Sequence, residues 1–254
     1  MIISGKYWSK AWSLVEGCTP ISPACDNCWL KAMNHRFKTE IALTDGGVLN
    51  LTDDDGNWSG DVISMVSRLD LPMKTKKPTI FAVWSDLFHE AVPVDFIIEA
   101  FERMEYCEQH TFLVLSKRPE RMLSVLYGQE GNFYLGGGDY MPNVWLGTTV
   151  ENQEMADKRI PELIECAPGH LFLSIEPMLG PVKIFPHYSK NINQVICGGE
   201  TGRNARRCNP DWVRSLRDQC KAAGVRFFLK KIGKSRELDG TTHDDLAWRL
   251  NGMD

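Results

Sequence analysis

The stretch VDFIIEAFERMEYCEQHTFLVLSKR, residues 94–118, contains one repeating unit of the fold that we expect for this chain. Residues 94–106 carry apolar side chains at the three- and four-residue spacing of an amphipathic helix. Residues 111–115, TFLVL, form a short apolar run rich in residues that favour β-structure, which predicts a buried strand. A helix that leads into a buried strand is typical of a parallel sheet built from βα units.

The same alternation extends along the chain in both directions. Amphipathic segments at residues 153–165 and 210–223 predict two more helices, and a helix is also expected at residues 28–37. Strands are expected at residues 79–84, 111–115, 144–147, 171–175, 194–197 and 225–229, with another near residues 11–15. We therefore predict an α/β fold, a partial or complete (β/α) barrel of six or seven βα units.

Length and composition favour one domain over residues 1–254. The chain has 43% apolar residues, which is enough for one sizeable core, and α/β barrels of this length stay single domains. Residues 44–60 contain Asp-Gly-Gly and Asp-Asp-Asp-Gly and interrupt the alternation, so they predict an exposed hairpin insertion. No apolar run approaches the length of a membrane span, and residues 1–17 lack an export signal. We expect a cytoplasmic protein whose eight cysteines stay reduced.

Charge is distributed unevenly along the chain. The net charge is -4, but residues 203–236 carry eleven Lys or Arg against two Asp. This asymmetry predicts a surface for a polyanion such as DNA. An ordinary solvated helix face with charged loops is the alternative interpretation. The candidate nucleic-acid-binding residues are Arg203, Arg206, Arg207, Lys230 and Lys231.

The most specific motif is GCTPISPACDNC, residues 17–28, which spaces Cys18, Cys25 and Cys28 as C-x6-C-x2-C between a strand and a helix. Three thiolates from one loop can bind three irons of a [4Fe-4S] cluster and leave the fourth iron open. Zinc is the alternative metal. A closed structural zinc site needs four ligands, and His35 could supply the fourth beside the three cysteines. Ordinary buried thiols remain a third possibility.

Polar residues follow each expected strand, where a barrel gathers its chemistry at the carboxyl ends. These residues are Ser85 and Asp86, then Ser116, Lys117 and Arg118, then Thr148, Thr149 and Glu151, then Ser174 and Glu176, then Glu200, and finally Lys230 and Lys231. Strand ends are often polar only because they meet water. Six polar ends in succession nevertheless predict a functional rim.

Several of these motifs together resemble a known family. They are residues 17–28, SDLFH at 85–89, LSKRPERM at 115–122, WLG at 145–147 with VEN at 150–152, SIEP at 174–177 with LGP at 179–181, and GGE at 198–200. The sequence resembles the phage-associated three-cysteine-motif family, a radical-SAM-like group of phages and prophages. The resemblance covers nearly the whole chain and implies a [4Fe-4S] cluster, S-adenosylmethionine and a phage-infected bacterial cell.

The resemblance also implies roles, with two departures from the broader radical-SAM pattern. The cysteine spacing is x6 then x2, and Gly-Gly-Glu follows a late strand, so Ser85 and Asp86 stand where Gly-Gly-Glu usually holds the methionyl amine. By position we expect Asp86 or Ser85 to bind that amine and Lys117 or Arg118 the carboxylate, with Ser116 beside them. We expect Glu151 or Ser174 to bind the ribose hydroxyls of S-adenosylmethionine. Glu176 and Glu200 are the candidate catalytic residues.

The expected reaction begins with a 5'-deoxyadenosyl radical that removes a hydrogen atom from the substrate. Phage association and the basic segment favour remodelling or isomerisation of an amino-acid-modified thymine in DNA. The alternatives are a pyrimidine-lesion repair lyase and a zinc-stabilised nucleic-acid-binding protein without catalysis. The expected partners are DNA and an electron donor such as flavodoxin or ferredoxin, and no membrane.

Overall fold

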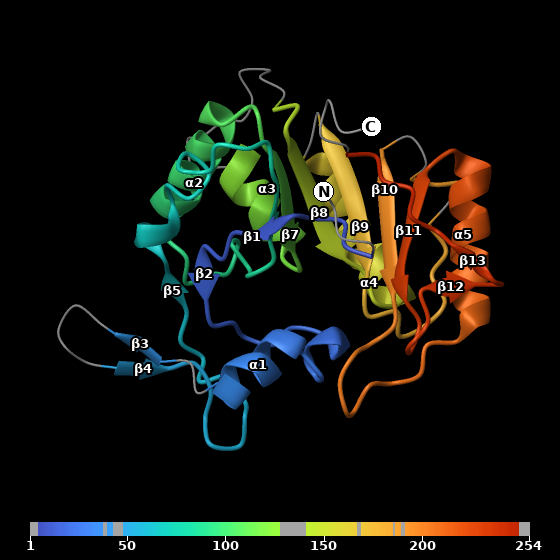
Figure 1. Cartoon of the computed structure of the whole chain (residues 1–254), viewed down its shortest axis with the longest axis horizontal. Coiled ribbons are helices and arrows are strands. Elements are labelled where there is room, and N and C mark those ends of the chain that lie inside the picture. The colour runs from blue at the N-terminus through green and yellow to red at the C-terminus, as the bar shows by residue number, and fades with distance from the viewer. Residues whose placement is uncertain are drawn as a thin grey trace.

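The structure is a computed structural model that describes residues 5–37, 40–42, 48–127, 141–166, 169–184, 186–188 and 191–248. Its centre is a curled, seven-stranded parallel sheet that forms a half-barrel (Figure 1). The strands lie in the order β1 (Lys10–Ala11), β6 (Ile80–Val83), β7 (Thr111–Ser116), β8 (Val144–Thr149), β9 (His170–Ile175), β10 (Gln194–Gly198) and β11 (Arg226–Lys231). The predicted partial barrel is therefore confirmed as an α/β half-barrel.

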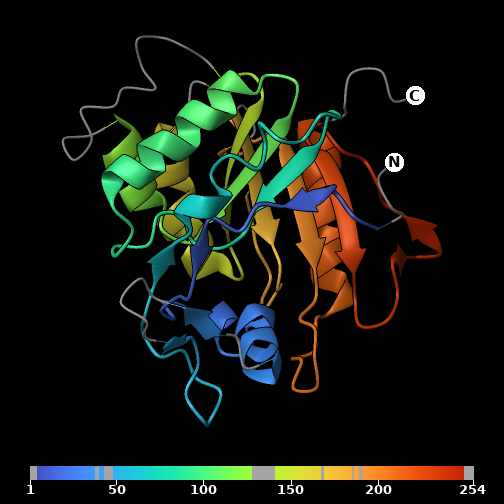
Figure 2. The same ribbon diagram turned by 60° about the vertical axis from the view of Figure 1, so that its left-hand side comes forward.

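Helices cover the outer face of this sheet (Figure 2). They are α2 (Val94–Tyr106), α3 (Pro119–Tyr127), α4 (Gln153–Glu165) and α5 (Pro210–Ala223). The side chain of Asn209 caps α5 by accepting from the Asp211 N–H at 2.9 Å, and Gly224 ends it in the left-handed conformation. The alternation has one exception, because the described residues between β9 and β10 contain turns and no helix.

The N-terminal segment departs most from the sequence-based expectation. The single strand expected near residues 11–15 is two short strands, β1 and β2 (Val15–Glu16), and β2 pairs antiparallel with β5 (Ile63–Ser64). Trp12, between the two strands, is fully buried, and its indole N–H donates to the Arg68 carbonyl at 2.7 Å. The short helix η2 (Val66–Arg68) follows β5.

The expected insertion is a hairpin that starts earlier than predicted. Strands β3 (Glu40–Ala42) and β4 (Val48–Asn50) pair antiparallel, and their connecting turn lies outside the described residues. A bridge between Thr52 and Trp58 then closes a second turn. A smaller antiparallel pair, β12 (Glu237–Leu238) and β13 (Thr241–Thr242), follows β11 near the C-terminus. No helix of the described chain is long and apolar enough to span a bilayer.

The concave face of the half-barrel is filled by side chains, one from each long strand. These are Ile80, Leu113, Trp145, Phe172, Ile196 and Phe228. Tyr7 and Trp248 close this layer from the two ends of the described chain, and the Trp248 indole N–H donates to the Tyr7 carbonyl at 2.7 Å. The interior is thus packed, so the open space lies above it, at the carboxyl ends of the strands.

Candidate active site

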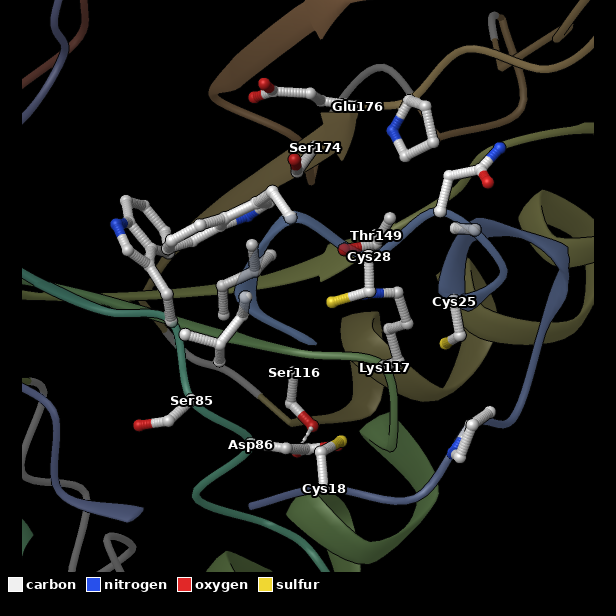
Figure 3. Close-up of a pocket in the computed structure, with 18 of the residues that line it drawn as sticks. Cys18, Cys25, Cys28, Ser85, Asp86, Ser116, Lys117, Thr149, Ser174 and Glu176 are labelled. Carbon is white, nitrogen blue, oxygen red and sulfur yellow. Dashed lines mark hydrogen bonds between the residues drawn. The ribbon is translucent and has the colours of Figure 1, made fainter. Parts of the chain in front are cut away.

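A pocket lies where the carboxyl ends of the strands meet the cysteine loop, residues 17–28, and helix α1 (Trp29–Phe37) (Figure 3). Twelve of the predicted site residues line it. They are Cys18, Cys25, Cys28, Ser85, Asp86, Ser116, Lys117, Arg118, Ser174, Glu176, Glu200 and Lys230. The pocket therefore joins the three cysteines to the ends of β6, β7, β9, β10 and β11, as the pattern of polar strand ends predicted.

Five other predicted residues do not line the pocket. Glu151 is fully buried beneath it, and Lys231 and three arginines of the 203–207 loop lie outside its lining. Glu151 therefore does not face the pocket, and the predicted ribose contact stays a prediction for Ser174. Thr149, which the sequence placed at the same strand end, lines the pocket in its place.

The cysteine loop is held in a defined shape by its own backbone. Gly17 has φ +83°, and a side chain at this position would run into the Asp61 carbonyl, so only glycine fits. The short helix η1 (Pro23–Cys25) carries Cys25, and the Cys28 N–H donates to the Cys25 carbonyl at 3.3 Å. Figure 3 shows the three sulfur atoms apart from one another, with that of Cys28 near the middle of the pocket residues drawn.

Cys18 is the most strongly perturbed of the three thiols. Burial and the nearby Asp86 carboxylate raise its pKa to about 11, although the positive charges of Arg118 and Lys117 act in the opposite direction. A thiol binds metal as the thiolate, so a metal centre would have to displace this proton. All three cysteines are unpaired thiols, which is the donor set that an iron–sulfur cluster requires.

Arg118 ties the cysteine loop to two neighbouring strand ends. Its guanidinium pairs with the buried Asp86 carboxylate, donates to both Glu90 oxygens at 2.9 Å, and donates to the Thr19 hydroxyl at 2.9 Å. The Ser116 hydroxyl donates to the other Asp86 oxygen at 2.6 Å (Figure 3). The polar atoms of Asp86 and Arg118 are therefore engaged within the protein.

His89 supports the same loop from the other side of Thr19. Its Nδ1 accepts the Ala91 backbone N–H at 3.1 Å, so Nε2 carries the proton and donates to the Thr19 hydroxyl at 2.8 Å. Burial lowers the pKa of His89, and the nearby Arg118 lowers it further. The neutral ring is the form that makes both hydrogen bonds.

Glu151 and Arg159 anchor the middle of the cysteine loop. Glu151 accepts the Ala24 backbone N–H at 3.3 Å and pairs with Arg159 at 2.9 Å, and both side chains are buried. Arg159 also donates to the Thr149 carbonyl at 2.7 Å. This buried pair connects β8, α4 and the residue next to Cys25.

Glu200 likewise anchors the cysteine loop, at Asn27. It accepts from the Asn27 amide at 2.9 Å and from the Arg206 guanidinium at 2.6 Å, and these bonds lower its pKa. Arg206 in turn donates to the Pro23 carbonyl at 2.7 Å and pairs with Asp26 at 3.1 Å. The loop after β10 is thereby fastened to the cysteine loop.

The remaining polar side chains of the pocket are those available to a ligand. Lys117 has no acidic partner among the described residues, and its charge acts on Cys18. On the opposite wall, Lys230 pairs with Glu176, whose other oxygen accepts from the Tyr7 hydroxyl at 3.4 Å. Burial and the Glu176 charge raise the pKa of Tyr7, so its phenol is protonated.

Indole rings form much of the apolar wall of the pocket. Trp8, Trp29, Trp58 and Trp84 all line it, and Trp8 and Trp84 meet edge to face with ring centroids 6.2 Å apart. Planar aromatic walls suit a planar ligand such as a purine or pyrimidine base. Sequence reasoning missed this wall because the four tryptophans come from four separate segments.

The expected positive surface is only partly present, because most cations of residues 203–236 have acidic partners. Lys230 pairs with Glu176 inside the pocket, and Arg206, which lies outside the lining, pairs with Glu200. Four more pair with carboxylates: Arg214 and Arg217 with Asp239, Arg226 with Asp245, and Arg236 with Asp244. The sequence could not show this pairing, because residues 237–254 supply the acids. Arg203 and Arg207 stay exposed without an ion-pair partner in the described chain.

The candidate fourth zinc ligand lies apart from the cysteines in this structure. His35 is exposed on α1, does not line the pocket, and lies against Gly56. Within the described residues, no group of three or more His, Cys, Asp and Glu side chains is arranged to hold one metal ion. A cluster binds each thiolate through a different iron, so it does not require three sulfurs to meet at one point.

Comparison with known proteins gives a family but no activity. A family model described as "Protein of unknown function (DUF5131)" matches residues 4–252, nearly the whole chain. The chain belongs to this family. Neither the curated proteins nor the solved structures contain a match. The DUF5131 match spans the half-barrel, the cysteine loop and α1 together, so the pocket lies wholly within the region that defines the family.

Proposed function

We propose that this chain is a radical-SAM enzyme in which Cys18, Cys25 and Cys28 hold a [4Fe-4S] cluster. The observation that supports the proposal is the place of the cysteine loop: all three thiols line one pocket at the carboxyl ends of a parallel half-barrel. Three ligands from one loop leave one iron open to a second cofactor. When bound, the cluster would supply the electron that cleaves S-adenosylmethionine and so starts radical chemistry on the substrate.

Lys117 is the residue we assign to the methionyl carboxylate. It reaches the cysteine side of the pocket, and unlike Arg118 it is not held by acidic neighbours within the described structure. Ser174 and Thr149 line the adjoining wall and can bond ribose hydroxyls. Ser85 and Asp86 remain candidates for the methionyl amine, which would have to join bonds that they already make. The Ser85 hydroxyl accepts the Val15 backbone N–H at 3.3 Å, and the Asp86 carboxylate accepts from Ser116 and Arg118.

Glu176 and Lys230 are the groups we place against the substrate, on the wall formed by the ends of β9 and β11. Their pair can hold and move a proton, with the Tyr7 hydroxyl as its buried neighbour. Glu200 lines the same pocket, but its carboxylate is occupied by Asn27 and Arg206, so we assign it a positioning role.

For the substrate we propose an amino-acid-modified thymine in phage DNA, which the enzyme would remodel or isomerise. A base must leave the base stack of DNA to enter such a pocket, and the four tryptophan rings of the pocket would give it planar, apolar surroundings. Arg203 and Arg207 are the exposed cations available for backbone phosphates near the mouth. A pyrimidine-lesion lyase would use the same pocket and differs only in the base presented.

The test is anaerobic reconstitution with iron and sulfide, followed by reduction in the presence of S-adenosylmethionine. We expect about four irons per chain, broad visible absorption, and release of 5'-deoxyadenosine. Replacing any one of the three cysteines with Ala should abolish the absorption, and Lys117→Ala should weaken S-adenosylmethionine binding while iron is retained. Stoichiometric zinc with no bound iron would instead support the non-catalytic zinc protein.

A further inference from the structure

Glu176 and Lys230 meet across a glycine at the carboxyl ends of three neighbouring strands. Glu176 directly follows β9, Lys230 lies in β11, and the strand between them, β10, ends at Gly198. A Cβ atom on Gly198 would lie 3.4 Å from the Glu176 Cγ and 3.5 Å from the Lys230 Cβ, so a longer side chain there would compete for the same space. The glycine therefore leaves room for the two charged groups to form their ion pair over β10.

This pair is open to the pocket and can form more hydrogen bonds than it does. Both residues line the pocket, and their side chains are 36% exposed for Lys230 and 17% exposed for Glu176. An ammonium group can donate several hydrogen bonds, and in the described structure that of Lys230 donates to Glu176. Each carboxylate oxygen can also accept more than one bond, and those of Glu176 accept from Lys230 and the Tyr7 hydroxyl. A ligand can therefore add an anionic and a cationic group without breaking the pair.

The other carboxylates that line the described pocket are buried and already held by arginines. Asp86 accepts from Ser116 and pairs with Arg118, and its side chain is 10% exposed. Glu200 accepts from the backbone and guanidinium of Arg206, and its side chain is 4% exposed. Within the described lining, the Glu176–Lys230 pair is therefore the place where one ligand can reach a negative and a positive group together.

The pair lies on the substrate side of the pocket, next to the indole wall. Figure 3 shows Glu176 at the opposite side of the pocket from Cys18 and Asp86. The amine and the carboxylate of S-adenosylmethionine are assigned to the cysteine side, so the pair remains for the substrate. Tyr7, which bonds Glu176, meets Trp84 edge to face with ring centroids 5.7 Å apart. A ligand that fits this wall has a planar ring with two opposite charges close to it.

We propose that Glu176 and Lys230 select the substrate by a free amino-acid group, whose carboxylate binds Lys230 and whose ammonium binds Glu176. The inference rests on the proposed function, and it restricts the modified thymine to one that carries both charges. Four charges that alternate in sign attract each neighbour, and such contacts are stronger in a pocket than in bulk water. A pyrimidine lesion without an amino acid would leave both protein groups without a ligand partner, and a polar site rejects such a molecule.

The test measures the binding of nucleosides to the metal-free protein by isothermal titration calorimetry at pH 7. The probe is thymidine that carries glycine on its methyl group through the glycine nitrogen. One relative has a carboxamide in place of the carboxylate, another has an acetylated nitrogen, and plain thymidine has neither charge. The glycine nucleoside should bind about tenfold more tightly than either relative, because each relative lacks one charge-assisted contact.

Variants that remove one charge should reverse the order of the two relatives. Lys230→Met leaves Glu176 without its cation, so this variant should prefer the carboxamide, which is a cation. Glu176→Gln leaves Lys230 without its anion and should prefer the acetylated relative, which is an anion. Arg226→Met, at the other end of β11, is the control and should keep the wild-type order. Structural damage alone would weaken all nucleosides alike, and that result would overturn the inference.

Nucleoside binding needs no cluster, so its outcome is separate from that of the proposed function. The reversal of preference in a protein that holds no iron would support the amino-acid site and remove the radical enzyme. A loaded cluster together with equal affinities for thymidine and the glycine nucleoside, or with no binding of either, would overturn the inference and leave the enzyme. Weaker S-adenosylmethionine binding in both variants, with unchanged nucleoside binding, would assign the pair to the cofactor and also overturn it.

Discussion

Replacing Arg118 with Met removes the guanidinium that joins the cysteine loop to β6 and β7. The Asp86 carboxylate then remains buried, with the Ser116 hydroxyl at 2.6 Å as its remaining side-chain donor among the described residues. Removing one member of a buried ion pair typically costs about 3–5 kcal/mol. The contact with Glu90 adds little, because that side chain is 66% exposed. For a chain of this size the cost corresponds to a loss of roughly 6–20 °C in Tm.

Urea unfolding of the metal-free protein, followed by circular dichroism, measures this effect without any cofactor. Arg226→Met is the matched control, because its pair with Asp245 is about half exposed on both sides and should contribute less than about 1 kcal/mol. Asp86→Asn in the Arg118→Met background should recover part of the loss, since a neutral amide needs no counter-charge. If the Arg118→Met protein were as stable as the Arg226→Met control, Arg118 would not be the residue that holds the cysteine loop to β6 and β7.

Three further predictions concern the buried groups around the site. His89→Gln should make the free energy of unfolding less dependent on pH below 6.5, because the folded-state pKa of His89 is lowered and the wild type loses stability as the unfolded state takes up the proton. Arg159→Met should destabilise the protein by about 3–5 kcal/mol, since it leaves the fully buried Glu151 unpaired. Gly147→Ala should cost about 1–3 kcal/mol, because its methyl group would clash with the Phe172 ring.

The two stability variants each have a control substitution, either on the same helix or of the same residue type, and the His89 variant is compared with the wild type. Lys158→Met removes an exposed cation next to Arg159 on α4 and should be nearly neutral. Gly180→Ala adds the same methyl group where the nearest atom, the Asn152 Cβ, is 3.6 Å away. For His89 the readout is the difference between wild type and variant, because burial also lowers the pKa of His170 and His243. A variant whose stability tracks the wild type at every pH would contradict the assignment.

The regular elements could be predicted because their signals are local. Helices α2, α4 and α5 have the predicted bounds, and every long strand lies within two residues of its expected limits. The gathering of polar strand ends around the cysteine loop followed from the topology of a parallel sheet. The closure of the concave face by Tyr7 and Trp248 could not be predicted, because the two residues are 241 positions apart and neither belongs to a periodic pattern.

The roles of single charged residues were the least predictable part of the site. Whether a strand-end carboxylate faces a ligand or a cation depends on the partner, and the partners lie on other segments: Arg118 for Asp86, Arg159 for Glu151, and Arg206 for Glu200. Thr19 and His89 were missed as functional residues, although both stand inside motifs that drew attention for other reasons. Asn27 was also missed inside the cysteine motif, and Arg159 gave no signal that one sequence could reveal.

The polar residues at the strand ends thus fall into two groups, those that anchor the cysteine loop and those that are available to a ligand. Three anchors, at Thr19, Ala24 and Asn27, fix the cysteine loop from the strand ends, through Arg118, Glu151 and Glu200 respectively. A loop that presents thiols to a pocket cannot bury them in an apolar core, so hydrogen bonds and ion pairs must hold it in place. The charged groups left over, Lys117 on one wall and the Lys230–Glu176 pair on the other, are therefore the ones whose loss should alter ligand binding more than stability.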